Sequence, residues 1–177
     1  MKIKYKQTQP YGCGMYAVAN ALNIDNYISL DRLQQSQKGN SYNQLNKWLE
    51  ESGYRYNIEC MYHTVFKNEE TGHGLHLPKE VFFYSDSKEK TIPILINVQK
   101  NKDSKTHLVA AWLTNDYLIL LDSMFDEMKF LKWEELSSYY ESIYGVWIFQ
   151  HQDNQSGYIC FEANKESHIN QETFTAA

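Results

Sequence analysis

The chain has 177 residues and a hydrophobic content of 42%, which suits a single domain with its own buried core. Its formal net charge of −5 argues against a nucleic-acid binder, because contacts with phosphates need patches of Lys and Arg. No apolar run approaches the roughly 20 residues of a membrane-spanning helix, and three cysteines without a framework spacing indicate a reducing compartment, so we expect a cytoplasmic protein with no membrane span.

The first element is predicted as a helix over about Cys13–Asn23. Pro10 and the glycines that follow prevent the helix from extending backwards, and its residues are apolar on nearly every side, which indicates central burial. Cys13 then lies in the first turn, where unpaired backbone N–H groups and the positive end of the helix dipole stabilise a thiolate. The pKa of a cysteine, ordinarily about 8.5, can fall to roughly 3.5–7.5 in such settings. Cys13 is therefore a candidate nucleophile.

Two further helices are predicted in the first third of the chain. One spans residues 29–37. The other begins after Ser41, whose spacing from Gln44 is that of a capping box, and Gly53 supplies the left-handed residue that ends it. The first third of the protein is therefore expected to be helical.

The hydrophobic period changes to two at residues 54–66, which is typical of a strand with one buried face. Residues 67–90 are polar and are predicted to form a long surface connection, with a short element around 81–83. Pro93 would place the start of the next strand at an edge or a bulge. The later elements are predicted as strands at 91–98, 107–113, 117–122 and 145–149 and a helix at 132–141.

Helices followed by an antiparallel sheet define an α+β fold class. We expect one domain over residues 1–151 and a polar, partly flexible C-terminal extension over 152–177. From about residue 163 the extension is predicted to be a flexible tail. The sequence shows no repeat and no second domain.

Two polar residues occupy strand ends where the hydrophobic pattern does not require them. His107 begins one strand and Asp122 ends the next, and a turn at 114–116 makes the two strands a hairpin, so the two side chains should be near neighbours. An aspartate that accepts from one imidazole nitrogen leaves the other nitrogen to take the thiol proton of Cys13. The side-chain amide of Gln7 could donate into an oxyanion hole together with the backbone N–H of Cys13.

The order Gln7, Cys13-Gly14, His107-Leu108-Val109 and Asp122 resembles papain-like cysteine peptidases, and most of all the bacteriocin-processing peptidases that remove double-glycine leaders. The resemblance covers roughly residues 1–150. It implies a papain-like fold and a peptide or protein substrate. It also implies catalysis by Gln7, Cys13, His107 and Asp122 without a cofactor.

The chain departs from that family on either side of the site. Gly12 stands where a polar or acidic residue is usual before the cysteine, and Ser123 stands where a proline usually follows the aspartate. The resemblance therefore predicts the acyl-enzyme chemistry and not the double-glycine substrate.

Alternative interpretations of the candidate residues remain. Cys13 could be a small buried core residue, as free cysteines commonly are, and Gln9 competes with Gln7 for the oxyanion role. Cys60 is expected on the apolar face of its strand, and Cys160 is likewise interpreted as structural. A metal site is not predicted, because the spacing of the remaining candidate ligands fits no zinc pattern; these are His63, His73 and His76.

Two alternative functions use the same set of residues. Transglutaminase-like and arylamine acetyltransferase enzymes also carry Cys, His and Asp in that chain order, and they pass the acyl group to an amine. A peptidase-like domain that has lost activity could bind an extended peptide in the same groove.

Overall fold

The computed structural model has helices and an antiparallel sheet and belongs to the α+β class, as the sequence predicts. It describes residues 1–8, 12–24, 41–62, 66–67, 90–114, 117–152, 159–162 and 174–176. Within these ranges, no helix is long and apolar enough to cross a membrane. The helix predicted at 29–37 and nearly all of the 67–90 connection lie outside the described residues.

The two α-helices begin and end as their sequences predict. α1 (Cys13–Ala21) follows Gly12, whose φ of 92° lies in the left-handed region that favours glycine. α3 (Tyr42–Glu51) begins with the predicted capping box, and Gly53 follows its end with a φ of 89°. All the residues of α1 except Cys13 are buried, as expected for a helix that is apolar all round.

The strands of the described residues join into one nine-stranded sheet. They are β1 (Tyr56–Tyr62), β2 (Phe66–Lys67), β3 (Lys90–Gln99), β4 (Thr106–Leu113), β5 (Leu118–Leu121), β6 (Lys129–Leu131), β7 (Ser142–His151), β8 (Ile159–Glu162) and β9 (Phe174–Ala176). The main path runs β1-β7-β3-β4-β5-β6, and every pairing is antiparallel. β2 pairs with β7, and β8 pairs with β3 and β9.

Pro93 lies where β3 changes partners. On one side of β3, β8 pairs with Lys90 and Thr91, and β7 begins its pairing at Ile94. Pro93 falls between the residues that pair with these two partners, a position that suits a residue without a backbone N–H. Pro93 therefore lacks a partner in β7 and β8 but is paired with Trp112 of β4, so it is not in an edge strand.

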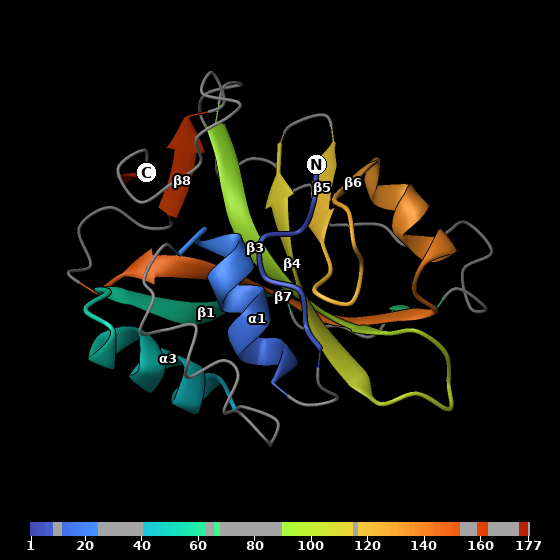
Figure 1. Cartoon of the computed structure of the whole chain (residues 1–177), viewed down its shortest axis with the longest axis horizontal. Helices are drawn as coiled ribbons and strands as arrows, with labels where there is room; N and C mark the ends of the chain where they lie inside the picture. The colour runs from blue at the N-terminus through green and yellow to red at the C-terminus, as the bar shows by residue number, and fades with distance from the viewer. Residues whose placement is uncertain are drawn as a thin grey trace.

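The sheet has a hydrophobic core on each face. α1 and α3 lie in front of the sheet in Figure 1, and they bury Leu108, Ala110 and Trp112 of β4 with them. The alternate residues of β4 face a second cluster, which also contains Trp133 and Leu136. The indole N–H of Trp112 donates to the carbonyl of Ala21 at 3.0 Å and holds the end of α1 on β4. This bond and the shared core hold α1 against β4.

The α-helix predicted over 132–141 is a shorter 3₁₀ helix, η2 (Trp133–Ser138). Its two buried residues, Trp133 and Leu136, are three positions apart, which matches the three-residue turn of a 3₁₀ helix. The helix ends early, and Tyr140 beyond it is buried against the sheet. Tertiary packing outweighs the helical propensity of this segment.

The segment predicted as a flexible tail contains a short strand, β9. β9 pairs with β8, and β8 in turn pairs with the start of β3. The polar composition of the segment does not reveal this backbone pairing.

Candidate active site

Cys13 stands at the first position of α1, as predicted. Gly12 makes no side-chain cap and the first turn of the helix has no acidic residue, so no carboxylate competes with the sulfur for the positive end of the helix dipole. The backbone N–H groups of Gly14 and Leu108 donate hydrogen bonds to Cys13, and the His107 side chain is hydrogen-bonded to it. The nucleophile candidate therefore lies at the junction of α1 and β4.

His107 and Asp122 are neighbours, as the predicted hairpin requires. The register of β4 and β5 pairs Leu113 with Leu118, and its continuation places Asp122 opposite Val109. His107 and Asp122 are thus diagonal rather than direct partners on one face, two residues apart in register. The imidazole Nε2 donates to the Asp122 Oδ1 at 2.9 Å, which leaves Nδ1 for Cys13.

The three groups stabilise a charge-separated state. Burial alone would raise the pKa of Cys13, but the hydrogen bond and positive charge of His107, with the two backbone N–H groups, bring that pKa below its ordinary value. Burial likewise opposes charge on His107, yet hydrogen bonds and negative charge from Asp122 and Cys13 raise the pKa of His107 to about 9. The two pKa changes both favour a thiolate–imidazolium pair over the neutral thiol and imidazole.

Asp122 is held by donors on three sides. Besides His107, the phenol of Tyr140 donates to Oδ2 at 2.5 Å, and the N–H of Met124 donates to Oδ1 at 2.9 Å. Burial opposes ionisation of Asp122, but the His107 hydrogen bond and charge, followed by the Tyr140 and Met124 bonds, bring its pKa below the ordinary value. The carboxylate is ionised and fixed in orientation, as a group that orients an imidazole needs to be.

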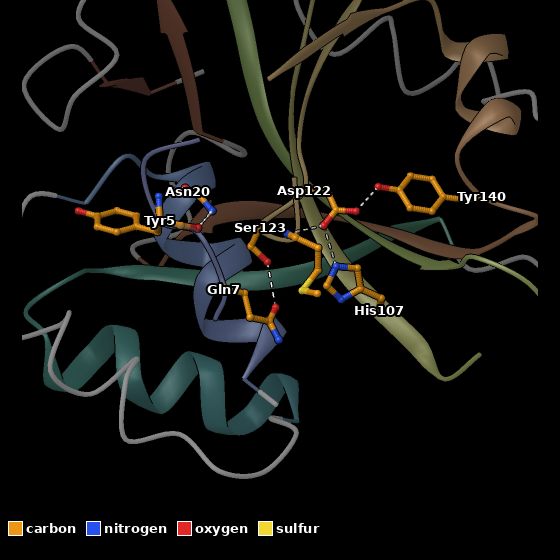
Figure 2. A network of polar contacts seen from close by, with 8 residues as sticks. Tyr5, Gln7, Asn20, His107, Asp122, Ser123 and Tyr140 are labelled. Atoms are coloured by element: carbon orange, nitrogen blue, oxygen red, sulfur yellow. Dashed lines mark hydrogen bonds and ion pairs between the residues drawn. The ribbon is translucent and has the colours of Figure 1, made fainter. Parts of the chain in front are cut away.

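Gln7 is buried and is tied to the residue that follows Asp122. Its backbone N–H donates to the carbonyl of Ser123 at 2.7 Å, and the Ser123 hydroxyl donates to the Gln7 Oε1 at 3.0 Å. Figure 2 shows the amide oxygen of Gln7 facing Ser123 and its nitrogen facing away. Gln7 also lines one cavity together with His107 and Asp122.

The segment that carries Gln7 is fastened to α1 by Asn20. The Asn20 side chain accepts from the backbone N–H of Tyr5 and donates to the carbonyl of the same residue, both at 3.0 Å (Figure 2). The backbone of Ile3 donates to that of Asp126 at 3.0 Å, on the chain that follows β5. Residues 1–7 are thereby held between α1 and the loop after Asp122.

A cavity of about 980 Å³ opens beside the imidazole. One wall is the turn between β3 and β4, which includes the exposed Lys100 and Lys105. Another wall contains Met124 and Phe125, and the side chain of Met124 is 54% exposed. Cys13 does not line this cavity but meets His107 at its margin. The volume is at the upper end of the range for ligand pockets in proteins.

The remaining sequence candidates lie elsewhere or outside the described residues. Cys60 is exposed, so the prediction of a buried structural residue is wrong. It lies on β1, at one end of the main strand order, and the register with β7 shifts after Cys60. Cys160 lies on β8, and nothing is described of its side chain. Outside the described residues lie Gln9, His63, His73 and His76.

Within the described ranges, no group of three or more His, Cys, Asp or Glu side chains is placed to hold a metal ion. The chain matches no model of a known protein family and none of the curated proteins with which it was compared. The site is therefore interpreted from its own geometry.

The sequence analysis missed three residues that support the site: Ser123, Tyr140 and Asn20. Ser123 was visible only as a departure from a family pattern, and Tyr140 lay in a predicted helix. Asn20 had a local signal, since it is the single polar side chain in the buried part of an otherwise apolar helix. A buried amide in such a place needs hydrogen-bond partners, and these are the backbone groups of Tyr5.

Proposed function

We propose that the protein is a cysteine peptidase of papain-like fold that cleaves a peptide or protein substrate. The observation that carries the proposal is the bridging position of His107, whose imidazole binds the Asp122 carboxylate at 2.9 Å through Nε2 and is hydrogen-bonded to Cys13. A structural cysteine does not need a buried, carboxylate-oriented imidazole, whereas an activated thiolate does.

The proposed reaction has two steps. The Cys13 thiolate attacks the carbonyl carbon of the scissile bond, and the tetrahedral intermediate collapses to a thioester while the His107 imidazolium gives its proton to the leaving amine. His107 then accepts a proton from water as the water attacks the thioester, and the carboxylic acid leaves as the C–S bond breaks, which regenerates the thiolate and the imidazolium. Asp122 keeps the imidazole in place and balances its positive charge in both steps.

Gln7 has the proposed role of oxyanion donor. Its amide nitrogen faces away from Ser123, so the end of the amide that can donate to an oxyanion is not the end that meets the serine. The N–H of Cys13 at the start of α1 would be the second donor. The cavity beside His107 is the proposed place for substrate side chains next to the scissile bond, because it is lined by catalytic candidates and by the exposed Met124.

The test is a cleavage screen with the full chain on a proteome-derived peptide library, with new termini read by mass spectrometry. Cys13→Ala should lower turnover by at least 10³-fold, as losses of a catalytic nucleophile do, with an unchanged circular dichroism spectrum. Cys60→Ala is the matched control, because that thiol is exposed and lies on β1. Equal cleavage by wild type and Cys13→Ala contradicts the proposal.

A second measurement reads the thiolate directly. Iodoacetamide should label Cys13 at pH 6 much faster than it labels glutathione, because a thiol of ordinary pKa is almost fully protonated there. His107→Ala should remove this advantage. An added amine in the cleavage screen separates hydrolysis from acyl transfer, since an amide product in place of the acid identifies the acyltransferase alternative.

A further inference from the structure

We infer that Ser123 is a positioning residue that sets the orientation of the Gln7 side-chain amide for oxyanion binding; this inference rests on the proposed function. An amide has two similar ends, and only its nitrogen can donate to an oxyanion. A glutamine in this role therefore needs something nearby that distinguishes its oxygen from its nitrogen.

Ser123 holds Gln7 at two points. Its carbonyl accepts the backbone N–H of Gln7 at 2.7 Å, and its hydroxyl donates to the Gln7 Oε1 at 3.0 Å. The two residues are 116 positions apart in the chain and both are buried, with Ser123 only 1% exposed. The first contact places the backbone of Gln7, and the second selects one of the two amide orientations.

The selection follows from the hydroxyl proton. With the Gln7 oxygen toward Ser123, the hydroxyl donates to that oxygen and the amide nitrogen faces the opposite way (Figure 2). If the amide were reversed, its nitrogen would donate to the serine oxygen, and the serine proton would lose this acceptor in a buried place. The cost of leaving a buried donor without a partner favours the observed orientation by roughly fivefold or more.

Because Ser123 directly follows Asp122 in the chain, it also links Gln7 to the carboxylate that orients His107. Asp122 is fixed by His107 and Tyr140, so the neighbouring residue is held at a set distance from the imidazole. Ser123 thereby connects the carboxylate that orients His107 with the amide that would meet the oxyanion. A proline at this position has no hydroxyl and could not make the side-chain contact.

The test is a double-mutant cycle of Ser123→Ala and Gln7→Ala, measured as kcat and KM on a peptide that wild type cleaves. Ser123→Ala should lower kcat by roughly twofold with KM nearly unchanged, because the two amide orientations would become about equally populated. This loss is much smaller than the 10²–10³-fold loss on removing an oxyanion donor outright. In the Gln7→Ala background it should have almost no further effect, because the group that it orients is gone. Ser142→Ala, at another buried serine, is the matched control and should keep wild-type kcat.

Three outcomes overturn the inference: wild-type kcat in Ser123→Ala, an equal fold loss in both backgrounds, or a slowed iodoacetamide reaction of Cys13 that indicates damage to the thiolate pair. If wild type cleaves nothing, the proposed function fails, and the orientation of Gln7 is then decided by its side-chain amide NMR signals. These should shift in Ser123→Ala and stay unchanged in Ser142→Ala. Signals that do not respond to Ser123→Ala refute the orienting contact.

Discussion

Tyr140→Phe tests whether the buried carboxylate of Asp122 depends on a donor from outside the hairpin. The change removes one hydroxyl and keeps the ring, which is 4% exposed. The lost bond joins the phenol to the Asp122 Oδ2 at 2.5 Å. Burial and the nearby carboxylate raise the pKa of Tyr140, so the phenol remains a donor at every pH of interest.

The magnitude follows from the charge on the acceptor. A hydrogen bond to an ionised group contributes roughly 1.5–3 kcal/mol, so we expect Tyr140→Phe to lower the free energy of unfolding by about 2 kcal/mol at pH 7. At roughly 2–4 °C per kcal/mol for a chain of this length, Tm should fall by about 4–8 °C. Urea and thermal unfolding of the full chain measure both quantities. Tyr139→Phe is the matched control, because this half-buried neighbour packs against Phe125.

The pH dependence has a defined sign. The pKa of Asp122 is lower in the folded protein than in the unfolded chain, so its ionisation contributes stability above the unfolded pKa of about 3.9, and that stability is lost as pH falls through the folded pKa. Tyr140→Phe removes one of the hydrogen bonds that lower the pKa of Asp122, so the pKa of Asp122 in the variant is lowered less. The stability gap between wild type and variant should therefore be full at pH 7 and narrow below about pH 4.

A second cycle decides whether the phenol acts through Asp122. In an Asp122→Asn background the acceptor is no longer charged, and the cost of Tyr140→Phe should shrink to about 1 kcal/mol or less. A cost that is independent of pH and equal in both backgrounds would refute the reasoning, because it would assign the loss to packing of the ring.

Two further predictions concern the start of α1. Gly12→Ala should destabilise the fold by about 1–2 kcal/mol in urea unfolding, since a Cβ is disfavoured at a φ of 92°; an unchanged midpoint would contradict the left-handed conformation. Cys13→Ala should lower the pKa of His107 from about 9 in an NMR titration of the imidazole protons, because a hydrogen bond and negative charge are lost. A pKa that stays near 9 would mean that Asp122 alone sets it.

Local signals were enough to predict most of the described elements. The capping box of α3, the left-handed Gly53 and the apolar run of α1 are each decided within a few residues, and the structure confirms all three. The burial of a side chain on a strand at the end of the sheet cannot be predicted from the neighbouring residues in the sequence. Cys60 continues the alternation of Ile58, yet only Ile58 is buried, because exposure depends on which elements reach that end of β1.

In the candidate site, too, some contacts follow from local sequence patterns and others do not. Helix position, strand order and one hairpin predict that His107 lies beside Asp122, because the turn between their strands is short. The contacts of Ser123, Tyr140 and Asn20 link residues 116, 18 and 15 positions apart across loops, and no periodicity encodes them. They follow from a different requirement, which is that each buried polar group must find a partner.

That requirement explains why the N-terminal segment belongs to the site. A short segment without regular structure would normally fray, but residues 1–7 lie between α1 and the loop after β5 and bond to both. Asn20 binds the backbone of Tyr5 on one side, and Ser123 binds Gln7 on the other. Because each of these anchors is itself buried, displacing the segment would leave several polar groups unpaired at once. Gln7 is thereby held beside Asp122 by the same contacts that anchor the start of the chain.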